Sequence, residues 1–172
     1  IINDAGAVIS NTATIGRAID SATTSNTSLT ITNAGTISAN NNASSVAINL
    51  GDSNGGSSLT VANTGTISAG ALGTAIQVSD SGNSASISNT SGGVITGAIA
   101  VGANNATVTN NSTNGINGAI SATSGDLDVV NTSGTITGNI TTGSNAGSTV
   151  ALNGGSVVGN VILGNSSQSV TF

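Results

Sequence analysis

The 172-residue sequence predicts an all-β chain that folds as a parallel β-solenoid of about seven coils, each with three short strands. Three observations support this prediction. Ser, Thr, Gly and Asn together supply 101 residues, and all four are poor helix formers. Small aliphatic residues alternate with polar ones, as they do in half-buried strands. The same pattern recurs at intervals of 21 to 30 residues, which is typical of coils that stack on one another.

The first strand of each repeating unit ends in an asparagine. Stacked asparagines form hydrogen-bonded ladders in cross-β structures, so we expect a side-chain ladder along the solenoid axis. The predicted ladder residues are Asn11, Asn33, Asn63, Asn89, Asn110, Asn131 and Asn153. The residues two positions before them should face the core, and these are Ile9, Ile31, Val61, Ile87, Val108, Val129 and Ala151.

A second strand follows each asparagine after a corner that often contains glycine, a residue that tolerates the backbone angles of tight corners. Its predicted core residues include Ile37, Ile67, Ile95, Ile136 and Val157. A third apolar site then follows, at Ile19, Ile48, Ile76, Ile99, Ile120, Ile140 and Val161. Stacking should align these residues in continuous aliphatic columns.

Two units carry extra residues at the corner between the second and third strands. The insertions span residues 39–45 and 69–74 and are small, polar or rich in glycine. Because insertions in solenoids map to one face, we expect both loops to protrude from the same corner.

Residues 1–172 are interpreted as a single solenoid segment with uncapped ends. Residues 1–4 resemble the close of a preceding coil, and Val170 and Phe172 align with Thr149 and Ala151. Neither end shows a helix or a charged strand that would blunt an open edge. We expect the segment to continue within a longer chain or fibre, with the chain itself as a partner.

The composition excludes several classes of function. His, Cys, Glu and Lys are absent, which removes the side chains of a Ser-His-Asp triad and of the usual zinc and iron–sulfur sites. Six Asp and one Arg give a net charge of −5, which disfavours binding to nucleic acid and anionic lipid. No apolar run is long enough to span a bilayer as a helix. We therefore expect no enzyme activity, no cofactor, no nucleic-acid partner and no direct membrane insertion.

The recurrent phrasing of residues 29–40 (LTITNAGTISAN) and 127–140 (LDVVNTSGTITGNI) resembles the passenger regions of bacterial autotransporters, of type V secretion, and of filamentous adhesins. The resemblance covers essentially the whole chain. It implies a right-handed β-helix that is secreted to the bacterial cell surface and acts there as a stalk, adhesin or fibre, for example in a biofilm. Host or neighbouring-cell surfaces are the further partners that it implies.

One pair of carboxylates deserves comparison with an enzyme site. Asp126 and Asp128 alternate along a strand, so their side chains point the same way, about 7 Å apart. Glycoside hydrolases use two carboxylates at comparable separation, which makes a polysaccharide-degrading β-helix an alternative. No aromatic platform or nearby cation accompanies the pair. We therefore interpret it as outward and solubilising.

Two further features suggest binding. Asp52 and Asp80 each lie four residues after a third-site Ile and are weak calcium candidates, although Asx-turns also explain them and are the favoured interpretation. Thr-x-Thr segments at residues 30–32, 107–109 and 135–137 suggest an ice-binding face, and a carbohydrate-binding face is a related alternative. The threonine rows are interrupted at Ala62, Val130 and Leu152, which favours ordinary β-propensity as their cause.

Overall fold

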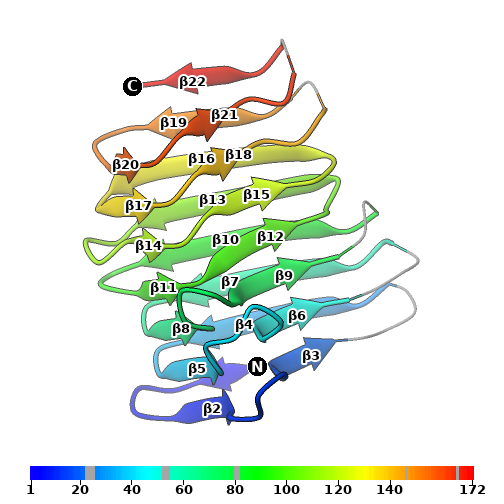
Figure 1. Ribbon diagram of the computed structural model, residues 1–172, viewed down its shortest axis with the longest axis vertical. Helices are drawn as coiled ribbons and strands as arrows, with labels where there is room; N and C mark the ends of the chain where they lie inside the picture. Colours follow the sequence, from blue (N-terminus) through cyan, green and yellow to red (C-terminus); the bar gives the residue numbers. More distant parts are fainter. Residues whose placement is uncertain (22–25, 52–54, 80–81, 146, 166) are drawn as a thin grey trace.

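The computed structural model describes residues 1–21, 26–51, 55–79, 82–145, 147–165 and 167–172. Within these ranges every regular element is a strand. Successive strands wind around one axis as right-handed coils, with the two termini near opposite ends of the stack (Figure 1). The predicted parallel β-solenoid of about seven coils with three strands per coil is therefore confirmed.

Sheet 1 contains the first strand of each coil, and all its neighbours pair in parallel. Its strands are β1 (Ile2–Asn3), β4 (Ser28–Asn33), β7 (Ser58–Asn63), β10 (Ser84–Thr90), β13 (Asn105–Asn111), β16 (Asp126–Ser133), β19 (Thr149–Leu152) and β22 (Ser169–Thr171). Inward and outward residues alternate along these strands, which explains the period-2 pattern of the sequence.

Sheets 2 and 3 hold the shorter second and third strands. Sheet 2 comprises β2 (Val8–Asn11), β5 (Thr36–Ala39), β8 (Thr66–Ser68), β11 (Val94–Thr96), β14 (Ile116–Asn117), β17 (Thr135–Thr137) and β20 (Ser156–Val158). Sheet 3 comprises β3 (Arg17–Ser21), β6 (Val46–Leu50), β9 (Thr74–Val78), β12 (Ala98–Val101), β15 (Ile120–Ala122), β18 (Ile140–Thr141) and β21 (Val161–Ile162).

Three aliphatic columns fill the space between the sheets. In sheet 1, Ile31, Val61, Ile87, Val108 and Val129 lie in register. A second column lies in register along sheet 2 and consists of Ile37, Ile67, Ile95, Ile116, Ile136 and Val157. Residues of the middle coils in these columns are almost completely buried. Burying one such side chain contributes about 1.5–3 kcal/mol, so the columns are the main source of stability.

The predicted position of Ile9 is wrong. Ile9 lies in β2 and pairs with Ile37, so it belongs to the column of sheet 2 and not to that of sheet 1. Five residues separate Asn3 from Ile9, whereas three separate Asn33 from Ile37. The longer first corner, together with a strand that also ends in an apolar-x-Asn pattern, makes β2 resemble a first strand.

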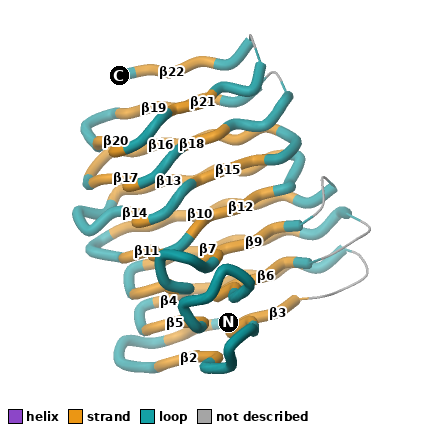
Figure 2. Tube along the Cα trace, viewed as in Figure 1, coloured by secondary structure: helices purple, strands orange, loops and turns teal. Residues whose placement is uncertain are grey.

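The two insertions protrude from the same corner, as predicted. They connect β5 to β6 and β8 to β9, and they lie beside each other on the outside of the lower coils (Figure 2). The backbone N–H of Leu72 in one loop donates to Asn41 Oδ1 in the other, at 3.1 Å. The loops thus stack coil on coil, like the strands that they connect.

The corner between the first and second strands requires glycine at Gly115. Its φ is +73°, and a Cβ atom there would lie 2.1 Å from the backbone oxygen of Thr135 in the next coil. Gly92, at the same corner one coil earlier, has φ +85° but only Asn114 Nδ2 nearby, at 3.7 Å.

We expect Gly92→Ala to cost about 1–2 kcal/mol, from backbone strain alone. Gly115→Ala should cost about 2–5 kcal/mol, because the backbone clash adds to the same strain. Urea denaturation followed by far-UV circular dichroism measures both. Equal losses in the two variants would contradict the close approach of coils at this corner.

Candidate functional site

An asparagine ladder runs through the interior along one edge of sheet 1. Each Asn side chain is at most 3% exposed, and the Nδ2 of every member except the last, Asn131, donates to the Oδ1 of the Asn in the next coil. The bonds join Asn3 to Asn33 (2.7 Å), Asn33 to Asn63 (2.7 Å), Asn63 to Asn89 (2.8 Å), Asn89 to Asn110 (2.9 Å) and Asn110 to Asn131 (2.9 Å). The ladder therefore links six successive coils by side chains alone.

The same amide groups also hold the corners. Asn33 Nδ2 donates to the backbone oxygen of Thr66, at 3.1 Å, and Asn110 Nδ2 donates to that of Ser133, at 2.8 Å. Both acceptors lie in the coil that follows the donor. Each asparagine thus satisfies buried carbonyl groups where the chain leaves sheet 1, which removes a desolvation penalty that the tight corner would otherwise carry.

Five of the seven predicted ladder residues lie in this ladder, and Asn11 does not. Asn11 lies in β2, where its Nδ2 donates to the backbone oxygen of Arg17 and its Oδ1 accepts from the N–H of Ala13. It therefore organises the loop between β2 and β3. Asn3 occupies the ladder position instead, because β1 is the strand that pairs with β4.

The prediction for Asn153 is also wrong, by one residue. Leu152 pairs with Asn131, and Asn153 is exposed at the following corner. A shift of one residue exchanges the two faces of a strand. The observed register places Val150 in the core, where Ala151 was predicted, and buries more apolar area. In the same register Val170 pairs with Val150 and so continues the core column, whereas Phe172 does not.

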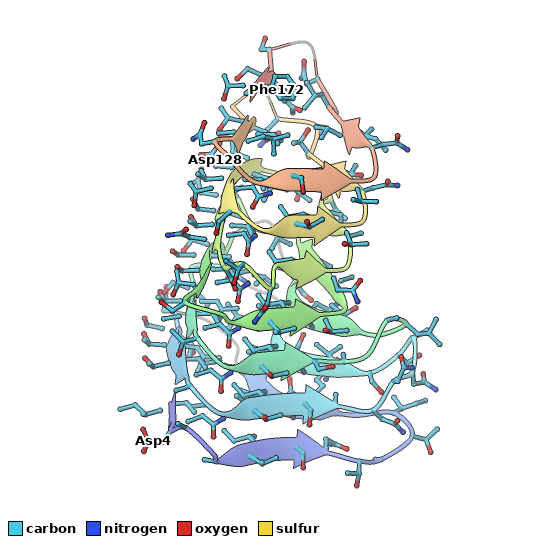
Figure 3. All side chains as sticks on the ribbon, turned by 90° about the vertical axis from the view of Figure 1, so that its left-hand side faces the viewer. Asp4, Asp128 and Phe172 are labelled. Carbon is cyan, nitrogen blue, oxygen red and sulfur yellow. The ribbon has the colours of Figure 1, made fainter. Side chains whose placement is uncertain are left out.

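Asp126 and Asp128 lie on the outer face of β16. Asp128 is seen near the upper part of the rod (Figure 3). Asp126 Oδ1 accepts the N–H of Gly147, at 3.1 Å. Asp128 Oδ1 accepts both the N–H and the hydroxyl of Thr149, at 3.0 and 2.7 Å. The carboxylates thus hold the start of the seventh coil. This geometry explains the pair as structural hydrogen-bond acceptors.

We expect Asp128→Ala to destabilise the seventh coil by about 1–2 kcal/mol, because it removes the acceptor for two donors of Thr149. Asp128→Asn keeps an oxygen at the same place and should retain at least half of that stability. Hydrogen exchange at the amide of Thr149 measures both effects. Unchanged exchange in the alanine variant would show that the carboxylate does not hold β19.

Comparisons with protein-family models, curated proteins and solved structures give no match.

The calcium candidates Asp52 and Asp80 lie outside the described residues. Among the residues that the structure does describe, no three acidic, His or Cys side chains gather as a metal-binding group. The same part of the chain contains no helix with the length and hydropathy to cross a membrane. Arg17 lies in the first coil, where its Nη1 is 3.2 Å from Asp20 Oδ2, and both side chains are substantially exposed.

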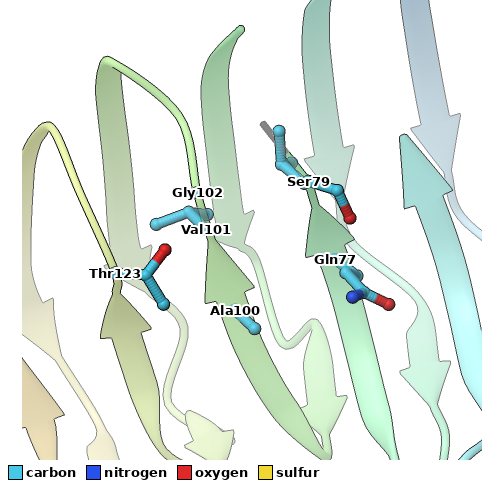
Figure 4. A pocket seen from close by; sticks show the side chains of 7 residues that line it. Gln77, Ser79, Ala100, Val101, Gly102 and Thr123 are labelled. Carbon is cyan, nitrogen blue, oxygen red and sulfur yellow. The ribbon is translucent and has the colours of Figure 1, made fainter. Parts of the chain in front are cut away.

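Two shallow hollows open on the outer face of sheet 3. One is lined by Gln77 and Ser79 on one side and by Thr123 on the other (Figure 4). The small residues Ala100 and Gly102 lie between them. The polar groups of this hollow are neutral hydroxyls and an amide, suited to contact with water. The other lies against the Arg17–Asp20 ion pair, next to Ile15 and Ser44. In the second hollow, the Asp20 carboxylate accepts from Arg17 Nη1 at 3.2 Å and from Asn49 Nδ2 at 2.7 Å. Within the described residues no hydrogen bond joins Asp20 to Ser44, so the carboxylate is not placed as a base for that hydroxyl.

Sheet 1 presents to solvent a row of hydroxyl groups that is interrupted by one carboxylate. The row consists of Thr30, Thr60, Ser86 and Thr107, then Asp128, Thr149 and Ser169. The neighbouring row contains Thr32, Ala62, Ser88, Thr109, Val130, Ala151 and Thr171. Ala151 interrupts it, and not Leu152 as predicted, because Leu152 lies in the inner register. The face is hydrated and polar but chemically irregular.

Proposed function

We propose that this chain is a non-enzymatic structural β-solenoid that forms the rigid shaft of a bacterial surface fibre or adhesin. The buried asparagine ladder from Asn3 to Asn131 is the observation that carries the proposal. It adds a chain of side-chain hydrogen bonds to three parallel backbone ladders. A load along the axis is then shared by many bonds in each coil, which suits a mechanical role.

The outer surface supports the same proposal. In the middle coils the outward positions of sheet 1 are mainly Ser and Thr, and the only cation of the sequence, Arg17, is paired with Asp20. Such a coat is hydrated and weakly charged, so it resists non-specific association through apolar patches. In the proposed shaft, further coils stack on the terminal ones by the same parallel pairing. These coils belong to the same chain or to another copy, and a host or neighbouring-cell surface is the distant partner.

The extracellular location can be tested on intact cells of the source organism. An antibody raised against residues 1–172 should label unpermeabilised cells, and external protease should remove the label. Labelling that requires cell lysis would overturn the proposal. Turnover of a polysaccharide that Asp128→Ala abolishes would overturn it in favour of an enzyme, and thermal hysteresis of the purified protein would favour ice binding.

The mechanical role has its own test. Single molecules held at their two ends should resist extension until coils are removed one at a time. The force needed should fall in variants of the ladder and stay unchanged in variants of exposed asparagines such as Asn111. Equal forces for both kinds of variant would show that the ladder does not carry load.

A further inference from the structure

We infer that Asn153–Gly154 is a site of spontaneous deamidation, a covalent modification that needs only water. In this reaction the backbone nitrogen of Gly154 attacks Cγ of Asn153, a C–N bond forms, and the side-chain nitrogen leaves as ammonia. Water then opens the resulting succinimide at either carbonyl. The product is aspartate or isoaspartate, with one new negative charge.

The reaction has three structural requirements. The residue after the asparagine must leave its nitrogen accessible, as glycine does because it lacks a Cβ atom. The attacking N–H must lose its proton, so a hydrogen bond from that group protects the site. The peptide that joins the two residues must also rotate, so a hydrogen bond to its carbonyl oxygen protects it too.

Asn153–Gly154 meets all three requirements. Both residues are exposed, at the corner that leads from β19 into β20. Within the described part of the chain, the peptide that joins them makes no hydrogen bond through its N–H or its carbonyl, and the Asn153 side chain makes none either.

Asn114–Gly115 provides an internal contrast. Its glycine N–H donates to the backbone oxygen of Ser112, at 3.1 Å, and Asn114 Nδ2 donates to that of Gly92, at 2.6 Å. Gly115 is buried, whereas Gly154 is exposed. Both reacting groups are therefore held away from each other.

Asn117–Gly118 is protected in another way. Asn117 belongs to β14, which pairs with β11 on one side and β17 on the other. Its carbonyl oxygen accepts the N–H of Gly97, at 2.9 Å, so the peptide to Gly118 is held in the sheet. Asn54, the asparagine of the remaining Asn-Gly pair in the sequence, lies outside the described residues.

Deamidation at this corner changes both charge and geometry. An isoaspartate at residue 153 inserts an additional backbone carbon before Gly154, close to Gly155, whose N–H donates to Asn131 O at 3.3 Å. It also places a carboxylate beside coils whose surface is almost uncharged. Among the three Asn-Gly pairs that the structure describes, the pair in the seventh coil is thus the one that should accumulate chemical damage with age.

The test is incubation of the folded protein at mildly alkaline pH, followed by peptide mass spectrometry and isoaspartate detection. Because the sequence contains one Arg and no Lys, elastase or thermolysin is the suitable protease. Asn153 should convert at least about tenfold faster than Asn114 and Asn117, which corresponds to about 1.4 kcal/mol for releasing the protecting bonds. Denaturant supplies the control, because there the three sites should react at similar rates.

Two variants complete the design. Asn153→Gln should abolish the fast formation of isoaspartate in the peptide that contains residue 153 and leave the circular dichroism spectrum unchanged, because the side chain is exposed. Asn114→Gln should leave the fast phase intact. Equal rates at the three sites in the folded protein, or a faster rate at Asn114, would overturn the inference.

Discussion

Ile136→Asp should destabilise the solenoid by more than about 4 kcal/mol, or prevent its sixth coil from folding. Ile136 is completely buried in the column of sheet 2, between Ile116 and Val157. A carboxylate there would lie among aliphatic side chains, far from Arg17 in the first coil. Because each coil is stabilised mainly by its neighbours, the loss should spread to the adjacent coils.

Thr137→Asp is the matched control for this prediction. Thr137 is the next residue of β17, and it points outward and is exposed. The same substitution there should cost no more than about 1 kcal/mol, the range of β-propensity. Far-UV circular dichroism during urea unfolding measures both variants, since the sequence has no Trp or Tyr for fluorescence. Similar midpoints for the two variants would contradict the assignment of Ile136 to the core.

The middle coils could be predicted from the sequence because several independent patterns agree there. Between Asn33 and Asn131 the apolar positions, the corner glycines and the asparagines all give the same register. An error of one residue would move a whole row of aliphatic side chains to solvent. The insertions did not disturb this register, because they lie in loops outside the sheets.

The sequence is misleading where only one pattern marks the register. At Asn11 the apolar-x-Asn motif marks a second strand, and only the pairing of β1 with β4 reveals that Asn3 is the ladder residue. At Asn153 the motif competes with the burial of Val150, and burial decides the register. Hydrogen bonds such as those of Asp128 to the next coil could not be predicted, because they depend on the stacking distance and not on local sequence.

The interior position of the ladder makes Asn110→Asp the sharpest test of its role. The two side chains have nearly the same shape, so packing is preserved and only the hydrogen-bonding character changes. Asn110 is completely buried, accepts from Asn89 Nδ2, and donates to Asn131 Oδ1 and to Ser133 O. An aspartate can still accept from Asn89 Nδ2, but it places an anionic oxygen against the two acceptors, Asn131 Oδ1 and Ser133 O. We expect a loss of about 3–5 kcal/mol at neutral pH.

The pH dependence of this loss separates a ladder effect from a general defect in folding. Burial without a cation raises the pKa of the introduced carboxyl above its unfolded value of about 3.9. The folded state then binds more protons than the unfolded state between the two pKa values, so stability falls as pH rises through that window. Acidification should therefore recover part of the loss, because a protonated carboxyl donates one hydrogen bond again.

Asn111→Asp, at the adjacent exposed residue, is the control and should change stability by less than about 0.5 kcal/mol at every pH. A loss of the same size at Asn110 in acid and at neutral pH would show that the ladder does not depend on the amide donor.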